Sequence, residues 1–119
     1  MNQHEKINYI ELPAFDLDAN KRFFTTVFGW IFEDFGEGYT AFSNQGLDGG
    51  FYKADLKSVQ AEGSALVVFY SEQLEDTMEK VKSANGKILQ EIFEFPGGRR
   101  FHFADPCGNE YAVWSEPAA

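Results

Sequence analysis

Residues 99–115 read RRFHFADPCGNEYAVWS, two segments of strand length around one turn. The turn is Asp105-Pro106-Cys107-Gly108, in which Pro at the second position favours a type I turn. Gly108 suits the left-handed conformation of a one-residue bulge that closes such a turn. The stretch therefore predicts an antiparallel hairpin of residues 99–104 and 110–115, with His102 opposite Ala112.

The side chains of this hairpin divide between two faces, because successive residues of a strand point in opposite directions. One face is mixed in character and carries Arg100, His102, Ala112 and Trp114. The other is apolar and carries Phe101, Phe103, Tyr111 and Val113. We expect the apolar face to pack under helices and the mixed face to line a cavity.

The rest of the chain contains the same order of elements twice. In the first half, a strand at 6–15 precedes a helix that Asp16 or Asp18 can cap and Gly29 ends. Three strands follow at 30–35, 39–43 and 49–53. In the second half, a strand at 65–70 precedes a helix that Ser71 can cap and Asn85-Gly86 ends. Strands at 87–95, 99–104 and 110–115 complete it.

This repetition predicts an internal duplication of a βαβββ unit within a single domain, 1–119. Module 1 covers about 5–53, a polar connector covers 54–63, and module 2 covers about 64–116. The expected fold class is α+β, with a curved mixed sheet around a cavity and the helices outside.

Composition limits the compartment and the partners. The chain has 119 residues, 44% of them hydrophobic, and a net charge of −9, which disfavours nucleic acid and anionic membrane surfaces as partners. No apolar run is long enough to span a bilayer, and residues 1–6 lack the apolar core of a signal peptide. The single cysteine, Cys107, excludes an intrachain disulfide, so we expect a cytoplasmic protein with Cys107 as a surface thiol.

Three groups of residues resemble the vicinal-oxygen-chelate superfamily, which includes glyoxalase I, bleomycin resistance proteins and extradiol dioxygenases. They are Ile10-Glu11-Leu12-Pro13 with Asp16-Leu17-Asp18, then Phe23-Phe24 with Val27-Phe28-Gly29-Trp30, and Asp105-Pro106-x-Gly108-Asn109. The resemblance implies βαβββ modules whose sheet curls around a cavity, with metal ligands on the first and last strands of the modules. It also implies a homodimer.

The metal-ligand positions of that family, carried over by count, fall on Tyr9, the region of Phe51, Leu66 and Ala112. None of these is His, Asp or Glu, and a lone phenol is a poor anchor for a divalent cation. We therefore expect no metal cofactor. A displaced divalent-metal site built from Glu11, His102 and Glu110 is the alternative.

The same alternation places Tyr9 and Glu11 of the first strand on the cavity side, with Tyr70 beside Leu66 and Val68 on the later strand. The expected ligand-binding set is a cup of aromatic and aliphatic side chains with a few polar points, as in small-molecule sites. Its members are Tyr9, Glu11, Phe51, Leu66, Val68, Arg100, His102, Ala112 and Trp114.

Two functions fit this cup. The first is binding of a partly apolar small molecule without a metal, as a bleomycin resistance protein sequesters its ligand. The second is a glyoxalase-like lyase or isomerase, or a dioxygenase-related enzyme, using an atypical metal site or acid–base chemistry by His102 and Glu11. Structural roles compete with these: Glu11 is also placed to pair with Arg100 or Lys6, and Trp30 and Trp114 suit a core or a dimer interface.

Overall fold

Each half of the chain folds into a strand, a helix and three further strands, as the sequence predicts. The computed structural model describes residues 2–118. The first module comprises β1 (Tyr9–Ala14), α1 (Leu17–Phe28), β2 (Phe32–Asp34), β3 (Tyr39–Gln45) and β4 (Leu47–Lys53). A short 3-10 helix, η1 (Gln60–Glu62), lies in the connector. The second module comprises β5 (Val67–Tyr70), α2 (Leu74–Ser83), β6 (Lys87–Phe95), β7 (Gly98–Ala104) and β8 (Glu110–Ser115).

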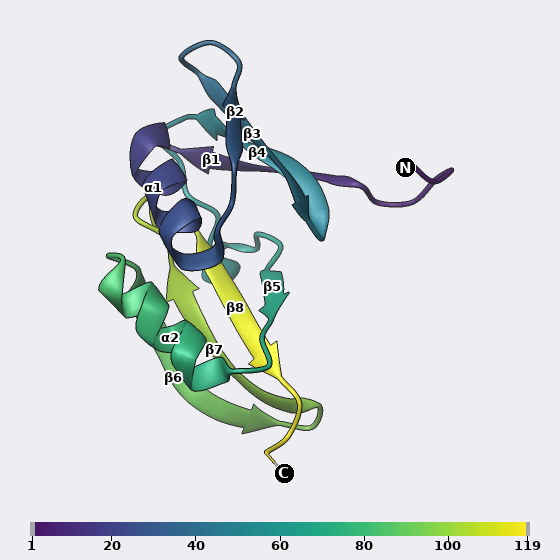
Figure 1. The fold of residues 1–119 in the computed structure, drawn as a ribbon, viewed down its shortest axis with the longest axis vertical. Coiled ribbons are helices and arrows are strands. Elements are labelled where there is room, and N and C mark those ends of the chain that lie inside the picture. The colour runs from purple at the N-terminus through teal and green to yellow at the C-terminus, as the bar shows by residue number, and fades with distance from the viewer. Residues whose placement is uncertain (1, 119) are drawn as a thin grey trace.

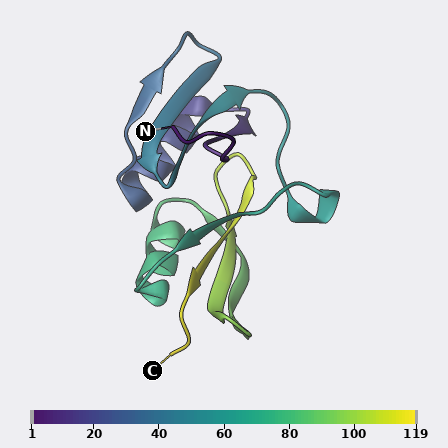
Figure 2. The same ribbon diagram turned by 90° about the vertical axis from the view of Figure 1, so that its right-hand side faces the viewer.

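The strands form two four-stranded sheets with the same topology, in the orders β1-β4-β3-β2 and β5-β8-β7-β6. In each sheet the first strand of the module runs parallel to the last, and the remaining pairs are antiparallel. Figures 1 and 2 show the two modules along the long axis of the molecule, with the N-terminal segment extending away from the body. The arrangement is α+β and open, without a closed barrel.

The hairpin predicted around Asp105 is confirmed. His102 lies opposite Ala112, Arg100 opposite Trp114 and Phe101 opposite Val113. The N–H of Gly108 donates to the carbonyl of Asp105 at 2.9 Å, and Gly108 has a φ of 90°. This left-handed conformation is one that side chains with a Cβ rarely adopt, so the turn depends on glycine here.

Both ends of α1 follow the local signals in the sequence, and the start of α2 departs from them. Asp16 is the N-cap of α1, its side chain accepting from the N–H of Ala19, and Gly29 ends the helix at a φ of 75°. The prediction that Ser71 caps α2 is wrong, because the N-cap is Gln73. The Ser71 hydroxyl instead accepts from the N–H of Gln73 at 2.9 Å, a local turn that precedes the helix.

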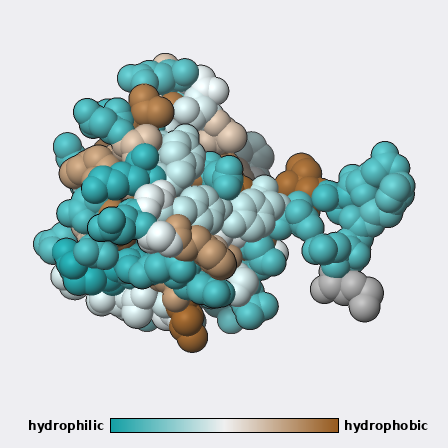
Figure 3. All heavy atoms as spheres, turned by 90° about the horizontal axis from the view of Figure 1, so that it is seen from above, coloured by the Kyte–Doolittle hydropathy of each residue, from teal (hydrophilic) through white to brown (hydrophobic). Residues whose placement is uncertain are grey.

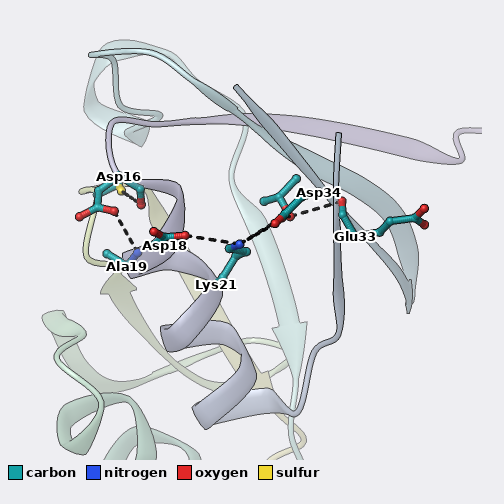
Figure 4. Close-up of polar contacts among 8 residues, drawn as sticks. Asp16, Asp18, Ala19, Lys21, Glu33 and Asp34 are labelled. Carbon is teal, nitrogen blue, oxygen red and sulfur yellow. Dashed lines mark hydrogen bonds and ion pairs between the residues drawn. The ribbon is translucent and has the colours of Figure 1, made fainter. Parts of the chain in front are cut away.

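Asp18, the other predicted cap, takes part in an ion-pair network on the surface of α1. Figure 4 shows the amine of Lys21 between the carboxylates of Asp18 and Asp34. The N–O distance to Asp34 is 3.0 Å, and Asp34 also accepts from the hydroxyl of Thr40 at 2.8 Å. These contacts tie α1 to the edge of its own sheet.

One hydrophobic core serves both modules, because the aromatic residues of α1 face the second sheet as well as the first. The rings of Phe23 and Phe103 lie 5.8 Å apart, and those of Phe28 and Phe69 stack at 4.5 Å. Trp30 is 6% exposed and stacks on Phe24, which assigns it to the core. The described residues include no helix long and apolar enough to span a membrane.

The carboxylate of Asp105 joins the modules beneath this core. It is 4% exposed and accepts five hydrogen bonds, two from the backbone N–H groups of Cys107 and Asn109 and three from side chains. The side-chain donors are Asn20 on α1 at 3.0 Å, Asn109 at 3.1 Å and Tyr111 at 2.7 Å. The turn and the first helix are thereby held to the same group.

Cys107 is buried, at 3% exposure, so the prediction of a surface thiol is wrong. The turn folds back against the junction of β1 and α1, where the Sγ of Cys107 lies 3.4 Å from the carbonyl oxygen of Asp16. Burial raises the pKa of this thiol, which disfavours the reactive thiolate.

We expect Asp105→Asn to lower the free energy of unfolding by about 3 kcal/mol, because the new amide group places its own N–H donors against donors that are already buried. Urea denaturation followed by circular dichroism measures this change. Asp55→Asn in the exposed connector is the matched control and should change stability by less than about 0.5 kcal/mol. Equal stability of the two variants would refute the joining role of Asp105.

Candidate functional site

The second sheet presents its mixed face on the side away from the core. Paired residues of neighbouring strands share a face, and Val68 lies opposite Ala112 while Tyr70 lies opposite Trp114. The pairs of β7 and β8 add Arg100 and His102 to the same face. The structure therefore places five predicted site residues together: Val68, Arg100, His102, Ala112 and Trp114. Leu66 precedes β5 and is half-buried.

His102 and Glu110 form a buried pair on this face. The Nδ1 atom of His102 lies 2.9 Å from Oε2 of Glu110, and the side chains are 1% and 11% exposed. The other carboxylate oxygen accepts from the N–H of Gln60 at 3.0 Å. Burial raises the pKa of Glu110, but the hydrogen bonds from His102 and Gln60 outweigh it and hold the pKa below its ordinary value. An ionised Glu110 favours the imidazole tautomer that carries its proton on Nδ1.

The second ring nitrogen of His102 has no hydrogen-bond partner. Nε2 is buried, and no described residue contacts it with a donor or acceptor. With the proton on Nδ1, Nε2 presents a free lone pair and acts as an acceptor. Buried polar atoms without partners are rare in folded proteins and cost stability, so they mark places where function competes with packing.

Arg100 is held by aromatic rings instead of by a carboxylate. Its guanidinium carbon lies 5.4 Å from the ring centre of Phe93 and 5.5 Å from that of Phe95, both on β6. The Nε atom of Arg100 is buried without a partner, and no ion pair joins Arg100 to another described residue. Its neighbour Arg99 points to the opposite face, where it pairs with Glu75 at 2.6 Å.

Aromatic side chains complete this face. The ring of Trp114 lies 5.1 Å from that of Tyr70 and 6.4 Å from that of Phe95, and the ring of Phe93 lies 5.8 Å from the imidazole of His102. Phe93 and Phe95 were not among the predicted site residues. Their side of the strand depends on two register shifts in β6, which no alternation pattern reveals.

The first sheet carries a separate polar cluster, made of Tyr9, Glu11 and Tyr39. The hydroxyl of Tyr39 donates to Oε2 of Glu11 at 2.9 Å, and the hydroxyls of Tyr9 and Tyr39 lie 2.6 Å apart. The predicted pairing of Glu11 with Arg100 or Lys6 is therefore wrong. Tyr39 is the nearer partner because its ring lies across Gly50, where a Cβ would be 2.2 Å from the Tyr39 hydroxyl. This use of a glycine has no signal in the sequence.

Phe51 and Ala112, two members of the predicted ligand-binding set, are both buried. Phe51 is fully buried on the helix side of β4, where its ring stacks 5.5 Å from that of Phe24, so it lies on the opposite face from Glu11. Ala112 lies on the mixed face but is fully buried. It provides room beneath its larger neighbours without contacting solvent.

The displaced metal site of Glu11, His102 and Glu110 does not form in this arrangement. His102 and Glu110 are adjacent, but Glu11 bonds to Tyr39 in the other sheet. Within residues 2–118, no three His, Cys, Asp or Glu side chains gather closely enough to hold a metal ion.

An apolar cavity of about 400 Å³ opens between the edges of the two sheets. Ile10 and Leu12 line it from β1, Trp30 and Phe42 line it from the core, and Val68 and Tyr70 line it from β5. The exposed side chains of Val68 and Tyr70 thus border both this cavity and the mixed face of the second sheet. Elsewhere, the surface seen in Figure 3 is largely hydrophilic with scattered apolar side chains.

The pKa of Tyr39 is raised above its ordinary value near 10 by burial and by the hydrogen bonds with Tyr9 and Glu11. Because the folded-state pKa lies above the unfolded value, neutral Tyr39 contributes stability that is complete below pH 10 and is lost as the pH rises through the folded-state pKa. In Glu11→Gln, we expect the pKa of Tyr39 to fall but to stay above 10, because burial persists. Titration of the Tyr39 ring carbon by NMR measures this, with Glu33→Gln as a control, and an unchanged pKa would contradict the contact.

Comparison with known proteins gives the same fold. A glyoxalase-related enzyme from Fulvimarina pelagi superposes with a TM-score of 0.79 at 20% identity, covering 94% of this chain and 88% of that one. The fosfomycin resistance protein FosX from Listeria monocytogenes superposes with a TM-score of 0.77 at 18% identity, covering 95% and 94%. A mutant of FosX has been solved with Mn(II) and 1S,2S-dihydroxypropylphosphonic acid.

Among curated sequences, the anthracycline biosynthesis protein DnrV from Streptomyces peucetius is 27% identical over 124 residues. The match covers 89% of this chain and 45% of DnrV, so the chain spans about half the length of that relative. The family model of the Glyoxalase/Bleomycin resistance protein/Dioxygenase superfamily matches residues 6–113. The chain belongs to the glyoxalase, bleomycin resistance protein and dioxygenase superfamily.

Proposed function

We propose that this protein binds a small, partly apolar organic molecule without a metal ion, on the mixed face of the second sheet. The observation that carries this proposal is the contrast between the two faces of that sheet. The helix side is packed and fully buried at Phe101, Phe103 and Val113. The other side leaves Val68 and Tyr70 44% and 48% exposed beside an unpaired Arg100. An apolar surface with a few polar atoms free to bond is what a small-molecule site requires.

The chemistry of the available side chains supports metal independence. The positions that correspond to ligands in metal-using relatives hold Tyr9, Leu66 and Ala112, together with the core residue Phe51. Three of these offer no donor atom at all, and the hydroxyl of Tyr9 is bonded to Tyr39. The residues present therefore do not fit a divalent cation of the kind bound in the Mn(II) structure of FosX.

The relatives are consistent with a small organic ligand, since FosX is named for fosfomycin resistance and DnrV for anthracycline biosynthesis. Resistance by sequestration requires binding alone. We place this activity in the cytoplasm, a reducing compartment that suits a chain with one free thiol, Cys107.

A second candidate function is proton transfer without a metal, and the His102–Glu110 pair favours it. A carboxylate on Nδ1 and a free lone pair on Nε2 are the arrangement of an oriented general base. The partner is Glu110, not Glu11 as the sequence suggested. This candidate predicts turnover that survives EDTA and is lost in His102→Ala, whereas pure binding predicts no turnover in either protein.

Ligand binding on the mixed face predicts a change in the fluorescence of Trp114. The chain has two Trp residues, and only Trp114 lies on that face, because Trp30 is in the core. A panel of neutral planar compounds such as naphthol should quench the wild type and Trp30→Phe, and should leave Trp114→Phe unchanged. EDTA and added Mn(II), Ni(II) or Zn(II) should shift the melting temperature by less than about 1 °C. A metal ion that does not bind the folded protein does not stabilise it, and its removal by EDTA does not destabilise it.

Metal independence and the location of the site can be refuted independently of each other. A melting temperature that rises with one metal and falls with EDTA would overturn metal independence while leaving the site in place. Quenching that persists in Trp114→Phe would move the site away from this face.

We also propose that the protein is a homodimer, in which a second copy packs against the edge strands β1 and β5 and closes the ligand site on the side of Val68 and Tyr70. Tyr9, Val68 and Tyr70 are 46%, 44% and 48% exposed near the edges of the two sheets. Unpaired sheet edges and apolar side chains favour pairing with another chain. Sedimentation at micromolar concentration should give a dimer for the wild type and a monomer for Val68→Arg.

Leu56→Arg is the matched control for this substitution, because Leu56 is equally apolar and 61% exposed but lies in the connector. It should leave the dimer intact. A wild-type monomer across the micromolar range would refute the homodimer.

A further inference from the structure

Two polar groups on the mixed face of the second sheet have no partner among residues 2–118, and they differ in chemistry. Arg100 supplies a positive charge, and Nε2 of His102 supplies a lone pair when the neutral ring carries its proton on Nδ1, toward Glu110. Because these residues are two positions apart on β7, their side chains leave the same face about 7 Å apart. Phe93 contacts both, with its ring 5.4 Å from the guanidinium carbon and 5.8 Å from the imidazole. The two groups therefore belong to one continuous surface.

The charge of Arg100 is unusual in its setting. The chain has nineteen acidic and ten basic residues, so carboxylates are plentiful. Arg99 and Lys21 each pair with one or two of them. Arg100 instead stacks on two Phe rings, with no described carboxylate within ion-pair distance. A guanidinium held in this way offers its planar face and its N–H groups to a ligand carboxylate.

The acceptor on His102 is fixed by its neighbours. Gln60 holds the Glu110 carboxylate through its backbone N–H, and Glu110 holds Nδ1, so the ring cannot turn without breaking its hydrogen bond to Glu110. Nε2 is therefore set to accept from an O–H or N–H group. His102 is 1% exposed, so a ligand must displace a neighbouring side chain to reach it. Arg100 is the neighbour on β7 that can move without breaking a hydrogen bond.

From these contacts we propose that the ligand is a planar organic acid, whose carboxylate pairs with Arg100 and whose hydroxyl or amine donates to Nε2 of His102. The ring of the acid lies among Phe93, Phe95 and Trp114. Pairing with the carboxylate draws the guanidinium away from Phe93, so that this ring, which lies against the imidazole, can shift and open the path to Nε2. This inference rests on the proposed function and specifies the class of molecule that the same face binds.

The test uses 4-hydroxybenzoate and two analogues, 4-hydroxybenzamide without the charge and 4-methoxybenzoate without the donor. Isothermal titration of the wild type should give an affinity for 4-hydroxybenzoate at least tenfold higher than for either analogue. Arg100→Gln should abolish the preference over the amide. Arg99→Gln, the adjacent residue on the opposite face, is the matched control and should keep it.

A second readout needs no variant that risks misfolding. In the ¹⁵N spectrum of the free wild type, the imidazole of His102 should show a protonated Nδ1 and an unprotonated Nε2. Addition of 4-hydroxybenzoate should shift the Nε2 resonance, and 4-methoxybenzoate should not.

The outcomes separate this inference from the proposed function. If the wild type binds 4-hydroxybenzoate and 4-hydroxybenzamide with equal affinity, the organic acid is refuted while binding on this face stands. The same conclusion follows if the Nε2 resonance does not respond to 4-hydroxybenzoate. If none of the three compounds binds and neutral planar compounds also fail to quench Trp114, the proposed function is refuted as well.

Discussion

The buried carboxylate of Asp105 is the group on which the geometry of the molecule depends. Its five donors come from the turn that contains it, from Asn20 on α1 and from Tyr111 on β8. Asn109 extends the network, donating to the carbonyl of Pro13 at 2.7 Å and accepting from the N–H of Ser58 at 2.8 Å. Burial raises the pKa of Asp105, although these hydrogen bonds oppose the effect. One turn in module 2 thereby positions β1, α1 and the connector.

The geometry of the candidate site depends on this hydrogen-bond network. The turn fixes the register of β7 and β8, and a slip of one residue would exchange His102 for a phenylalanine on the mixed face. The contact with Ser58 also holds the connector in place, and the connector supplies the N–H of Gln60 that bonds to Glu110. The orientation of His102 is thus set from outside its own strand.

The sequence could predict features that depend on neighbouring residues, such as helix ends, turns and the faces of a strand. Gly29 ends a helix and Gly108 closes a turn because only glycine adopts their backbone conformations readily, and these signals are visible in any single chain. The alternation of 99–115 sufficed to group Arg100, His102 and Trp114. The errors arose where a distant segment decides the outcome. Cys107 is buried by the β1–α1 junction, and Glu11 bonds to Tyr39, which lies 28 residues away and reaches it across Gly50.

The two modules share a topology but differ in the chemistry of their open faces. The first carries Glu11, already bonded to a phenol, whereas the second carries Arg100 and Nε2 of His102, neither of which has a hydrogen-bond partner in the described part of the chain. A buried acceptor left unpaired costs about 1–3 kcal/mol in a folded protein. This cost lowers the stability of the free protein, so a ligand donor that bonds to Nε2 recovers it as binding free energy. A group whose partners are already satisfied offers no such gain, because a ligand must first displace them. The free energy available for binding therefore lies in the second module.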